Sequence, residues 1–157
     1  MALRVLHIDD ELDILTTVKA ALEKVADVDI ATSLGDALEK LNSGDIIPYD
    51  VLLVDLLLSD ASDIQVVTAL RPYRIPMIVI SALGDPDVLK RAAAAGADDF
   101  FIKPYLKRDE LIERIHFVCE RAKCPRPSKV CAKIRPETFE SVKPFITYGS
   151  KAPFVAA

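Results

Sequence analysis

Hydrophobic and polar positions are arranged in two different ways along the first 122 residues. Short runs of apolar residues rich in Val, Ile and Leu are typical of buried strands, whereas apolar residues spaced three or four positions apart are typical of amphipathic helices. The two kinds of segment alternate along the chain. The expected strands are residues 4–8, 28–31, 51–54, 77–80 and 98–102, and the expected helices are residues 11–25, 34–41, 64–70, 87–95 and 107–121.

Residues that favour helix ends support several of these boundaries. Ser33 directly precedes the second expected helix and can accept hydrogen bonds from its first amides. Asp85 and Pro86 stand at the start of the fourth helix, where an N-cap and a first-turn proline are favoured, and Gly96 follows its end. The third helix must end near Pro72, because proline cannot continue a helix.

The alternation of five strands with five helices, joined by short connections, predicts an α/β fold. Such a chain forms a parallel sheet covered by helices on both faces, which explains why the strands are apolar throughout. Right-handed crossovers make the sheet doubly wound. Ligands of doubly wound sheets bind outside the carboxyl ends of the strands.

Polar residues end four of the apolar runs. Asp9 and Asp10 follow the first strand, Asp55 follows the third, Ser81 follows the fourth and Lys103 follows the fifth. Burying a charge is costly unless another group pairs with it, so a lone carboxylate in an apolar run indicates a site. We expect all five side chains at one edge of the sheet.

This set of residue types favours phosphoryl chemistry with a metal ion. Clustered carboxylates repel one another unless a cation lies between them, and hard oxygen ligands favour Mg²⁺. The absence of Cys and His from this edge argues against zinc or copper. A lysine and a hydroxyl can bind phosphoryl oxygens, and an aspartate can act as the nucleophile and form an acyl phosphate.

Composition narrows the class of protein. Apolar residues make up 51% of the 157 positions, yet charges or prolines interrupt every long run, so no segment is expected to span a membrane. The early acidic residues argue against a signal peptide, and we expect a cytoplasmic protein. Three cysteines (Cys119, Cys124 and Cys131) without a CxxC pair are expected to be reduced thiols rather than disulfides or zinc ligands.

Charge divides the chain near residue 122. Residues 1–122 contain 13 Lys or Arg and 22 Asp or Glu, a net charge of −9, whereas residues 123–157 contain 7 and 2, a net charge of +5. Five of the ten prolines also lie in this C-terminal extension. We expect one domain over 1–122 and an extension over 123–157 without a recognisable output domain. Its basic and aromatic residues leave nucleic-acid contact open, but packing on a protein surface or disorder is favoured.

The residues Asp9-Asp10, Asp55, Ser81-Ala82 and Lys103-Pro104 resemble the signature of the response-regulator receiver domain of two-component signalling. The resemblance covers about residues 3–122, and within the family the chain is similar to chemotaxis regulators. It implies a flavodoxin-like (βα)5 fold, a doubly wound five-stranded parallel sheet with strand order 2-1-3-4-5. It also implies a signalling module in a phosphorelay rather than an enzyme.

The resemblance implies roles for the acidic residues. Asp55 would accept a phosphoryl group from a histidine kinase or a histidine phosphotransfer protein. Asp10, Asp55 and the backbone carbonyl of Leu57 would bind Mg²⁺, and Asp9 would act through a metal-bound water.

It also implies how the phosphoryl group is sensed. Lys103 would pair with the phosphoryl group and Ser81 would hydrogen-bond to it, while Phe100 occupies the family's aromatic switch position. The partners would be the kinase or phosphotransfer protein and a downstream protein target. A homodimer through the face of the fourth helix and fifth strand stays open.

The loop after Asp55 departs from the family pattern. Ser59 and Asp63 stand where the family usually has Pro and Gly, which leaves a pseudo-receiver that acts only as an interaction module as an alternative. Leu57 and Leu83 occupy positions that influence how water reaches the acyl phosphate, and we predict slow autodephosphorylation. An aspartate-nucleophile phosphatase is a weaker alternative, because such enzymes place a second acid where Leu57 stands.

Overall fold

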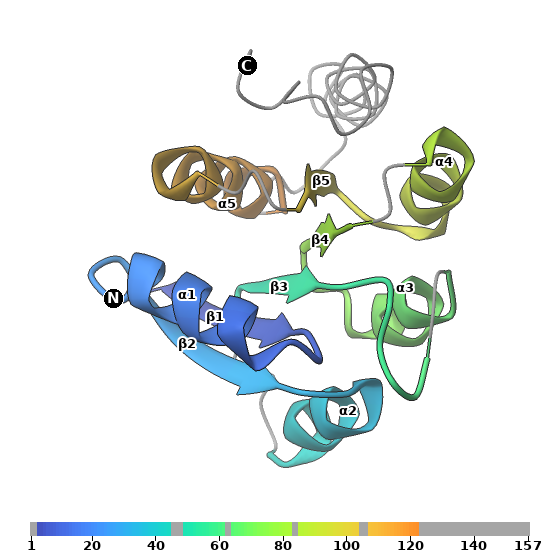
Figure 1. Ribbon diagram of the computed structural model, residues 1–157, viewed down its shortest axis with the longest axis horizontal. Helices are drawn as coiled ribbons and strands as arrows, with labels where there is room; N and C mark the ends of the chain where they lie inside the picture. The colour runs from blue at the N-terminus through green and yellow to red at the C-terminus, as the bar shows by residue number, and fades with distance from the viewer. Residues whose placement is uncertain (1–2, 45–48, 62–63, 83–84, 104–106, 123–157) are drawn as a thin grey trace.

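The computed structural model describes residues 3–44, 49–61, 64–82, 85–103 and 107–122 of the chain. These residues form a five-stranded parallel sheet in the order β2-β1-β3-β4-β5. Helices cover both faces of the sheet (Figure 1). The sequence-based prediction of the fold class and strand order is therefore confirmed. The expectations for residues 123–157 lie outside the described residues.

The elements follow one another as strand and helix along the whole described chain. The strands are β1 (Leu3–Ile8), β2 (Ala26–Ala31), β3 (Val51–Val54), β4 (Met77–Ser81) and β5 (Asp99–Ile102). The helices are α1 (Leu12–Leu22), α2 (Leu34–Asn42), α3 (Ile64–Leu70), the 3₁₀ turn η1 (Arg71–Tyr73), α4 (Pro86–Ala95) and α5 (Arg108–Ala122). Helices α1 and α5 lie on one face, and α2, α3 and α4 lie on the other (Figure 1).

The register of the sheet brings the ends of neighbouring strands to one edge. Ile8 pairs with Ala31 on one side and with Val54 on the other. One step beyond, the Asp9 N–H donates to the Ala31 carbonyl and the Asp55 N–H donates to the Ile8 carbonyl. Every residue of β3 and β4 is buried. The sheet therefore fixes the backbone of the acidic residues from a rigid, dry core.

The predicted helix caps are confirmed. The Ser33 hydroxyl accepts the Asp36 N–H over 3.0 Å at the start of α2, and the Asp85 carboxylate accepts the Asp87 N–H over 2.9 Å at the start of α4. Gly96 ends α4 with a φ of 131°, a conformation that strongly favours glycine.

Several predicted boundaries were wrong by one to three residues. The first helix ends at Leu22 rather than at residue 25, and β2 begins at Ala26 rather than at residue 28. The reason is tertiary, because β1 begins at Leu3 and Leu3 pairs with Ala26, which draws the chain out of the helix early. β5 begins at Asp99 rather than at residue 98. The third helix ends at Leu70 as predicted, and Pro72 lies in the 3₁₀ turn η1 that follows it.

The structure also bears on the expectations about membrane-spanning segments and cysteines. Within the described ranges no helix combines the length and apolar character needed to cross a membrane. Cys119 is buried on α5 and is in no disulfide within the described residues, and its Sγ donates a hydrogen bond to the Asp50 carbonyl over 3.7 Å. Cys124 and Cys131 lie outside the described residues.

Candidate functional site

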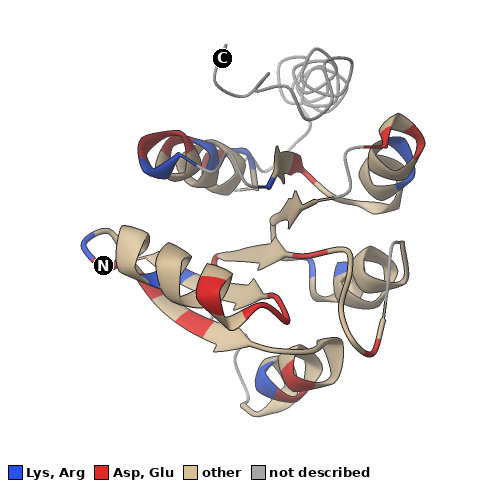
Figure 2. Cartoon of the chain, in the orientation of Figure 1, with Lys and Arg blue, Asp and Glu red and all other residues tan. Residues whose placement is uncertain are grey.

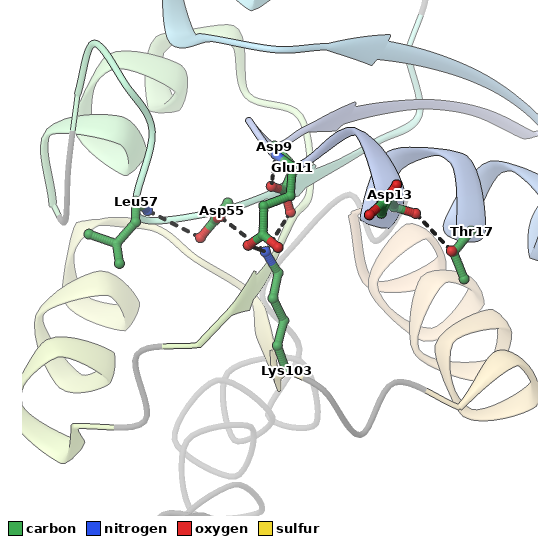
Figure 3. A network of polar contacts seen from close by, with 7 residues as sticks. All are labelled: Asp9, Glu11, Asp13, Thr17, Asp55, Leu57 and Lys103. Atoms are coloured by element: carbon green, nitrogen blue, oxygen red, sulfur yellow. Dashed lines mark hydrogen bonds and ion pairs between the residues drawn. The ribbon is translucent and has the colours of Figure 1, made fainter.

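An acidic pocket with a lysine at its centre lies at the carboxyl edge of the sheet (Figure 3). The Lys103 Nζ lies 2.6 Å from Asp9 Oδ2 and 3.1 Å from Asp55 Oδ2. The side chains of Asp9, Asp55 and Lys103 are only 0%, 4% and 8% exposed. The sequence analysis predicted these three residues from the ends of β1, β3 and β5, and the fold brings them into contact.

Local backbone amides orient the two buried carboxylates. Asp9 Oδ1 accepts the Glu11 N–H over 2.8 Å, and Asp55 Oδ1 accepts the Leu57 N–H over 3.1 Å. In both residues the other carboxylate oxygen, Oδ2, faces Lys103. Each carboxylate is therefore held at two points, and the single positive charge of Lys103 lies between the two negative charges.

Burial and charge act in opposite directions on the protonation of this pair. Burial raises the pKa of Asp9, the hydrogen bond from Lys103 lowers it, and the charge of Asp55 raises it further. Burial by itself lowers the pKa of Lys103, but the hydrogen bond to Asp9 and the charge of Asp55 more than offset this and raise it above its ordinary value. Lys103 is therefore a cation at neutral pH. Because Asp9 Oδ2 lies only 2.6 Å from this cation, we assign Asp9 as an ionised carboxylate.

The oxygen donors of this pocket suit a divalent cation. Asp9, Asp10, Glu11 and Asp55 offer carboxylate oxygens that all lie within 4.8 Å of one another. Two of the residues are buried and two, Asp10 and Glu11, are exposed at the rim. Figure 2 shows acidic positions gathered at the turn between β1 and α1 and at the end of β3. A set made only of oxygen donors, with an open side, is the type that Mg²⁺ prefers.

The remaining predicted residues surround this pocket in different ways. Ser81 is buried at the end of β4, and its carbonyl accepts the Lys103 N–H. Phe100 is buried on β5, in the core of the protein. Leu57 follows Asp55 in the loop after β3 and is 46% exposed. Ser59, in the same loop, is also exposed. Leu83 and Asp63 lie outside the described residues.

Two further contacts were not predicted from the sequence. Glu11 Oε1 lies 3.2 Å from Lys103 Nζ, so a third carboxylate shares the lysine. The signal was available, because Glu11 extends the acidic pair Asp9-Asp10 by one residue. Asp60 accepts two backbone amides from the start of α2, which lies 25 and 26 residues earlier in the chain. No pattern in the sequence indicates that contact.

A doubly wound sheet whose carboxyl edge carries buried aspartates and a lysine is typical of signalling receiver domains. The family model described as "Response regulator receiver domain" matches residues 5–116. The chain therefore belongs to the response regulator receiver domain family of two-component signal transduction. Receiver domains typically bind Mg²⁺ at an acidic pocket, and this edge of the sheet carries a cluster of Asp and Glu residues that could hold a metal ion.

Individual relatives agree with this assignment. The chain is 37% identical over 123 residues to the cell cycle transcriptional regulator CtrA of Caulobacter vibrioides, covering 77% of this chain and 52% of that protein. It is 34% identical over 123 residues to the cell cycle response regulator CtrA of Brucella ovis, with the same two coverages. The chain thus spans about half the length of these curated relatives.

Solved structures show the same fold. The receiver domain of the Francisella response regulator 1452 is 30% identical with a TM-score of 0.67, covering 76% of this chain and 98% of that one. A two-component response regulator from Clostridium difficile is 24% identical with a TM-score of 0.70, covering 77% and 98%. A beryllofluoride-activated DrrB receiver domain is 24% identical with a TM-score of 0.67, covering 76% and 99%.

Proposed function

We propose that this receiver domain accepts a phosphoryl group on Asp55 from a histidine kinase or a histidine phosphotransfer protein. The observation that carries the proposal is the placement of the Asp55 carboxylate. It is nearly buried, is oriented by the Leu57 amide and lies 3.1 Å from the Lys103 ammonium. Such a carboxylate is fixed in position and has a cation beside it to neutralise incoming phosphoryl oxygens.

The transfer is a balanced substitution at phosphorus. An oxygen of Asp55 attacks the phosphorus of a phosphohistidine, a P–O bond forms, the P–N bond breaks, and the imidazole nitrogen keeps the bonding electrons and takes up a proton. Lys103 compensates the charge that collects on the phosphoryl oxygens. The product is an acyl phosphate on Asp55.

A magnesium ion fits the donors of this pocket. Asp10, Asp55 and the carbonyl of Leu57 would hold it directly, and Asp9 would hold it through water. When bound, Mg²⁺ supplies positive charge for the phosphoryl oxygens. Lys103 and the carboxylates position the reacting groups.

Phosphorylation would change protein contacts through Ser81 and Phe100. Ser81 ends β4 and Phe100 lies on the neighbouring β5, where Phe100 pairs with Val79. A phosphoryl group on Asp55 would hydrogen-bond to the Ser81 hydroxyl, and a new position of that residue would alter the packing of Phe100. The consequence would be a changed surface at α4 and β5 for a downstream protein, or for a second copy of this chain.

We also propose that the receiver domain occupies residues 1–122, because α5 ends at Ala122, and that 123–157 form a separate extension. The proposed partners are proteins, a kinase or phosphotransfer protein and a downstream target. The name of the Caulobacter relative gives it a role in transcription. We propose no nucleic-acid contact for this chain.

The proposal is tested by intact mass after incubation with acetyl phosphate and Mg²⁺, with Asp55→Asn alongside. A gain of one phosphoryl group in the wild-type protein only is expected. A folded, Mg²⁺-binding protein that gains nothing from acetyl phosphate or from any phosphohistidine donor would favour the pseudo-receiver alternative. Continuous release of phosphate from a small phosphomonoester would favour the phosphatase alternative.

A further inference from the structure

Three carboxylates surround the Lys103 ammonium, which donates hydrogen bonds to Asp55 and Glu11 and forms an ion pair with Asp9. Its Nζ lies 2.6 Å from Asp9 Oδ2, 3.1 Å from Asp55 Oδ2 and 3.2 Å from Glu11 Oε1. A lysine ammonium has three donors and no acceptor. Because three carboxylates already lie close to these donors, a phosphoryl oxygen on Asp55 competes with them for Lys103.

Glu11 is the carboxylate that can leave most easily. Its side chain is 59% exposed, whereas those of Asp9 and Asp55 are 0% and 4% exposed. Asp9 and Asp55 are each held by a backbone amide as well as by Lys103. An exposed ion pair from a long side chain is weak, because solvent screens the charges and the side chain loses rotamer freedom.

The helix does not need the Glu11 side chain. Glu11 is the N-cap residue of α1, but its side chain makes no capping hydrogen bond, and the amide at this position is bound by Asp9 instead. In the sequence, Glu11 directly follows the acidic pair Asp9-Asp10, which comes immediately after β1. Its carboxylate therefore reaches the pocket, where Figure 3 shows it pointing toward Lys103.

We propose that Glu11 is a positioning residue that occupies a donor of Lys103 in the unphosphorylated protein and is displaced by the phosphoryl group. This inference rests on the proposed function and deepens it. Glu11 stabilises the unphosphorylated pocket, and its negative charge opposes an incoming anion. It therefore lowers the affinity of the Asp55 site for phosphoryl groups, and only donors that bind well by other contacts phosphorylate the domain efficiently.

The first turn of α1 offers a matched control. Asp13 is also an exposed acid in this turn, and it lies apart from the Lys103 cluster in Figure 3. Asp13→Asn removes one negative charge without touching the lysine, and Glu11→Gln removes the same charge together with the contact. Glu11→Asp keeps the charge but shortens the reach of the side chain.

The experiment measures the affinity of beryllofluoride, a phosphoryl mimic, by fluorine NMR at saturating Mg²⁺. We expect Glu11→Gln to bind it about three- to fivefold more tightly than the wild-type protein, the upper part of the range expected for loss of an exposed ion pair. Glu11→Asp is expected to shift in the same direction, and Asp13→Asn to stay within about twofold of the wild type. The NMR signal of the Lys103 ammonium should shift in both Glu11 variants and not in Asp13→Asn.

Each other outcome has a distinct meaning. Equal gains in Glu11→Gln and Asp13→Asn would reduce the effect to general charge and overturn the inference. Weaker binding in Glu11→Gln, with a higher Mg²⁺ requirement, would make Glu11 a metal ligand and also overturn it. A wild-type protein that binds no beryllofluoride would contradict the proposed function itself, whereas normal wild-type binding with an unchanged Glu11→Gln variant would contradict this inference alone.

Discussion

The carboxylate of Asp60 holds the backbone of Gly35, which lies 25 residues earlier in the chain. Asp60 Oδ2 accepts the Gly35 N–H over 2.8 Å, and Asp60 Oδ1 accepts the Leu34 N–H over 2.9 Å. These two hydrogen bonds lower the pKa of Asp60, and a negative charge at a helix N-terminus is favourable. The loop that follows Asp55 is thus anchored to the start of α2.

Replacing Asp60 with Ala should destabilise the protein and loosen this loop. Loss of a helix cap lowers the free energy of unfolding by about 1 kcal/mol, and by up to about 2 kcal/mol in strong cases. Ser33→Ala is the matched control, because the Ser33 hydroxyl caps the same helix α2 through a local hydrogen bond, whereas Asp60 reaches it from a distant loop. Urea unfolding should show comparable losses in both variants, but only Asp60→Ala should also weaken Mg²⁺ binding. Identical Mg²⁺ titrations would separate Asp60 from the site.

Arg114 neutralises a buried carboxylate on β5. Its Nη1 lies 2.7 Å and 2.8 Å from the two oxygens of Asp99, whose side chain is 2% exposed. Burial raises the pKa of Asp99, and Arg114 opposes that effect. Arg114→Met leaves the carboxylate buried without its partner, and we expect a loss of about 3–5 kcal/mol in the free energy of unfolding at pH 7.

The control for Arg114→Met is Asp109→Asn, which breaks the exposed pair between Asp109 and Arg108. That change should alter stability by less than about 1 kcal/mol. The double variant Arg114→Met, Asp99→Asn should recover most of the loss, because no charge is then left buried. A loss of similar size in the double variant would show that Arg114 acts by packing on Phe101 rather than by charge.

His7 should make the protein less stable as the pH falls below about 6.5. It is fully buried on β1, and neither ring nitrogen has a hydrogen-bond partner within the described part of the chain. Burial, with a smaller contribution from the Lys103 charge, lowers the pKa of His7 from 6.5 to about 3. Between these values the unfolded chain binds a proton that the folded protein does not. Stability therefore falls by about 1.4 kcal/mol per pH unit from this residue.

His7→Leu is the variant that isolates this effect. Urea unfolding between pH 7 and pH 4 should show a flatter stability profile than that of the wild type. The variant should also be more stable at pH 7, by about 1–3 kcal/mol, since the change removes unsatisfied buried polar atoms. Parallel profiles for the two proteins would mean that His7 becomes protonated in the folded state.

Lys103→Met should make stability depend strongly on Mg²⁺. Without the ammonium, Asp9 and Asp55 are two buried carboxylates with no cation, and we expect a loss of about 3–5 kcal/mol in metal-free buffer. Mg²⁺ should recover about 2.7 kcal/mol at one hundred times its dissociation constant. The wild-type protein should gain less at the same concentration, because Lys103 competes for the same oxygens.

Thermal unfolding with and without Mg²⁺ measures this difference. Lys107→Met serves as the control, since Lys107 is exposed at the start of the last helical segment and its loss should leave both stability and Mg²⁺ response nearly unchanged. An equal Mg²⁺ response in Lys103→Met and the wild type would argue that the ion binds away from Asp9 and Asp55.

Leu57 should slow hydrolysis of the acyl phosphate. It lies beside Asp55 with an apolar side chain that cannot orient water, although 46% of it is exposed. Leu57→Asn should shorten the lifetime of the phosphorylated protein severalfold, because an amide can hold a water molecule near the phosphorus. The decay of the phosphorylated mass after removal of acetyl phosphate measures this lifetime. Wild-type decay within seconds would contradict the prediction.

The sequence by itself determined the carboxyl ends of four of the five strands, and through them most of the pocket. Apolar runs followed by Asp9, Asp55, Ser81 and Lys103 carry this information locally, because a charge next to a buried strand is tolerated only where it faces a site. Strand–helix alternation was likewise enough for a doubly wound sheet. The helix caps Ser33 and Asp85 could also be predicted from local sequence, because each accepts a hydrogen bond from a residue no more than three positions away.

Only the tertiary structure decided the contacts between distant segments and the exact element boundaries. Lys103 and Glu11 are 92 residues apart, and Asp60 reaches α2 across the loop after β3. Local pattern reports whether a position is buried, but it does not report which loop lies beside it. The early end of α1 has the same origin, because the pairing of Ala26 with Leu3 outweighs local helix propensity.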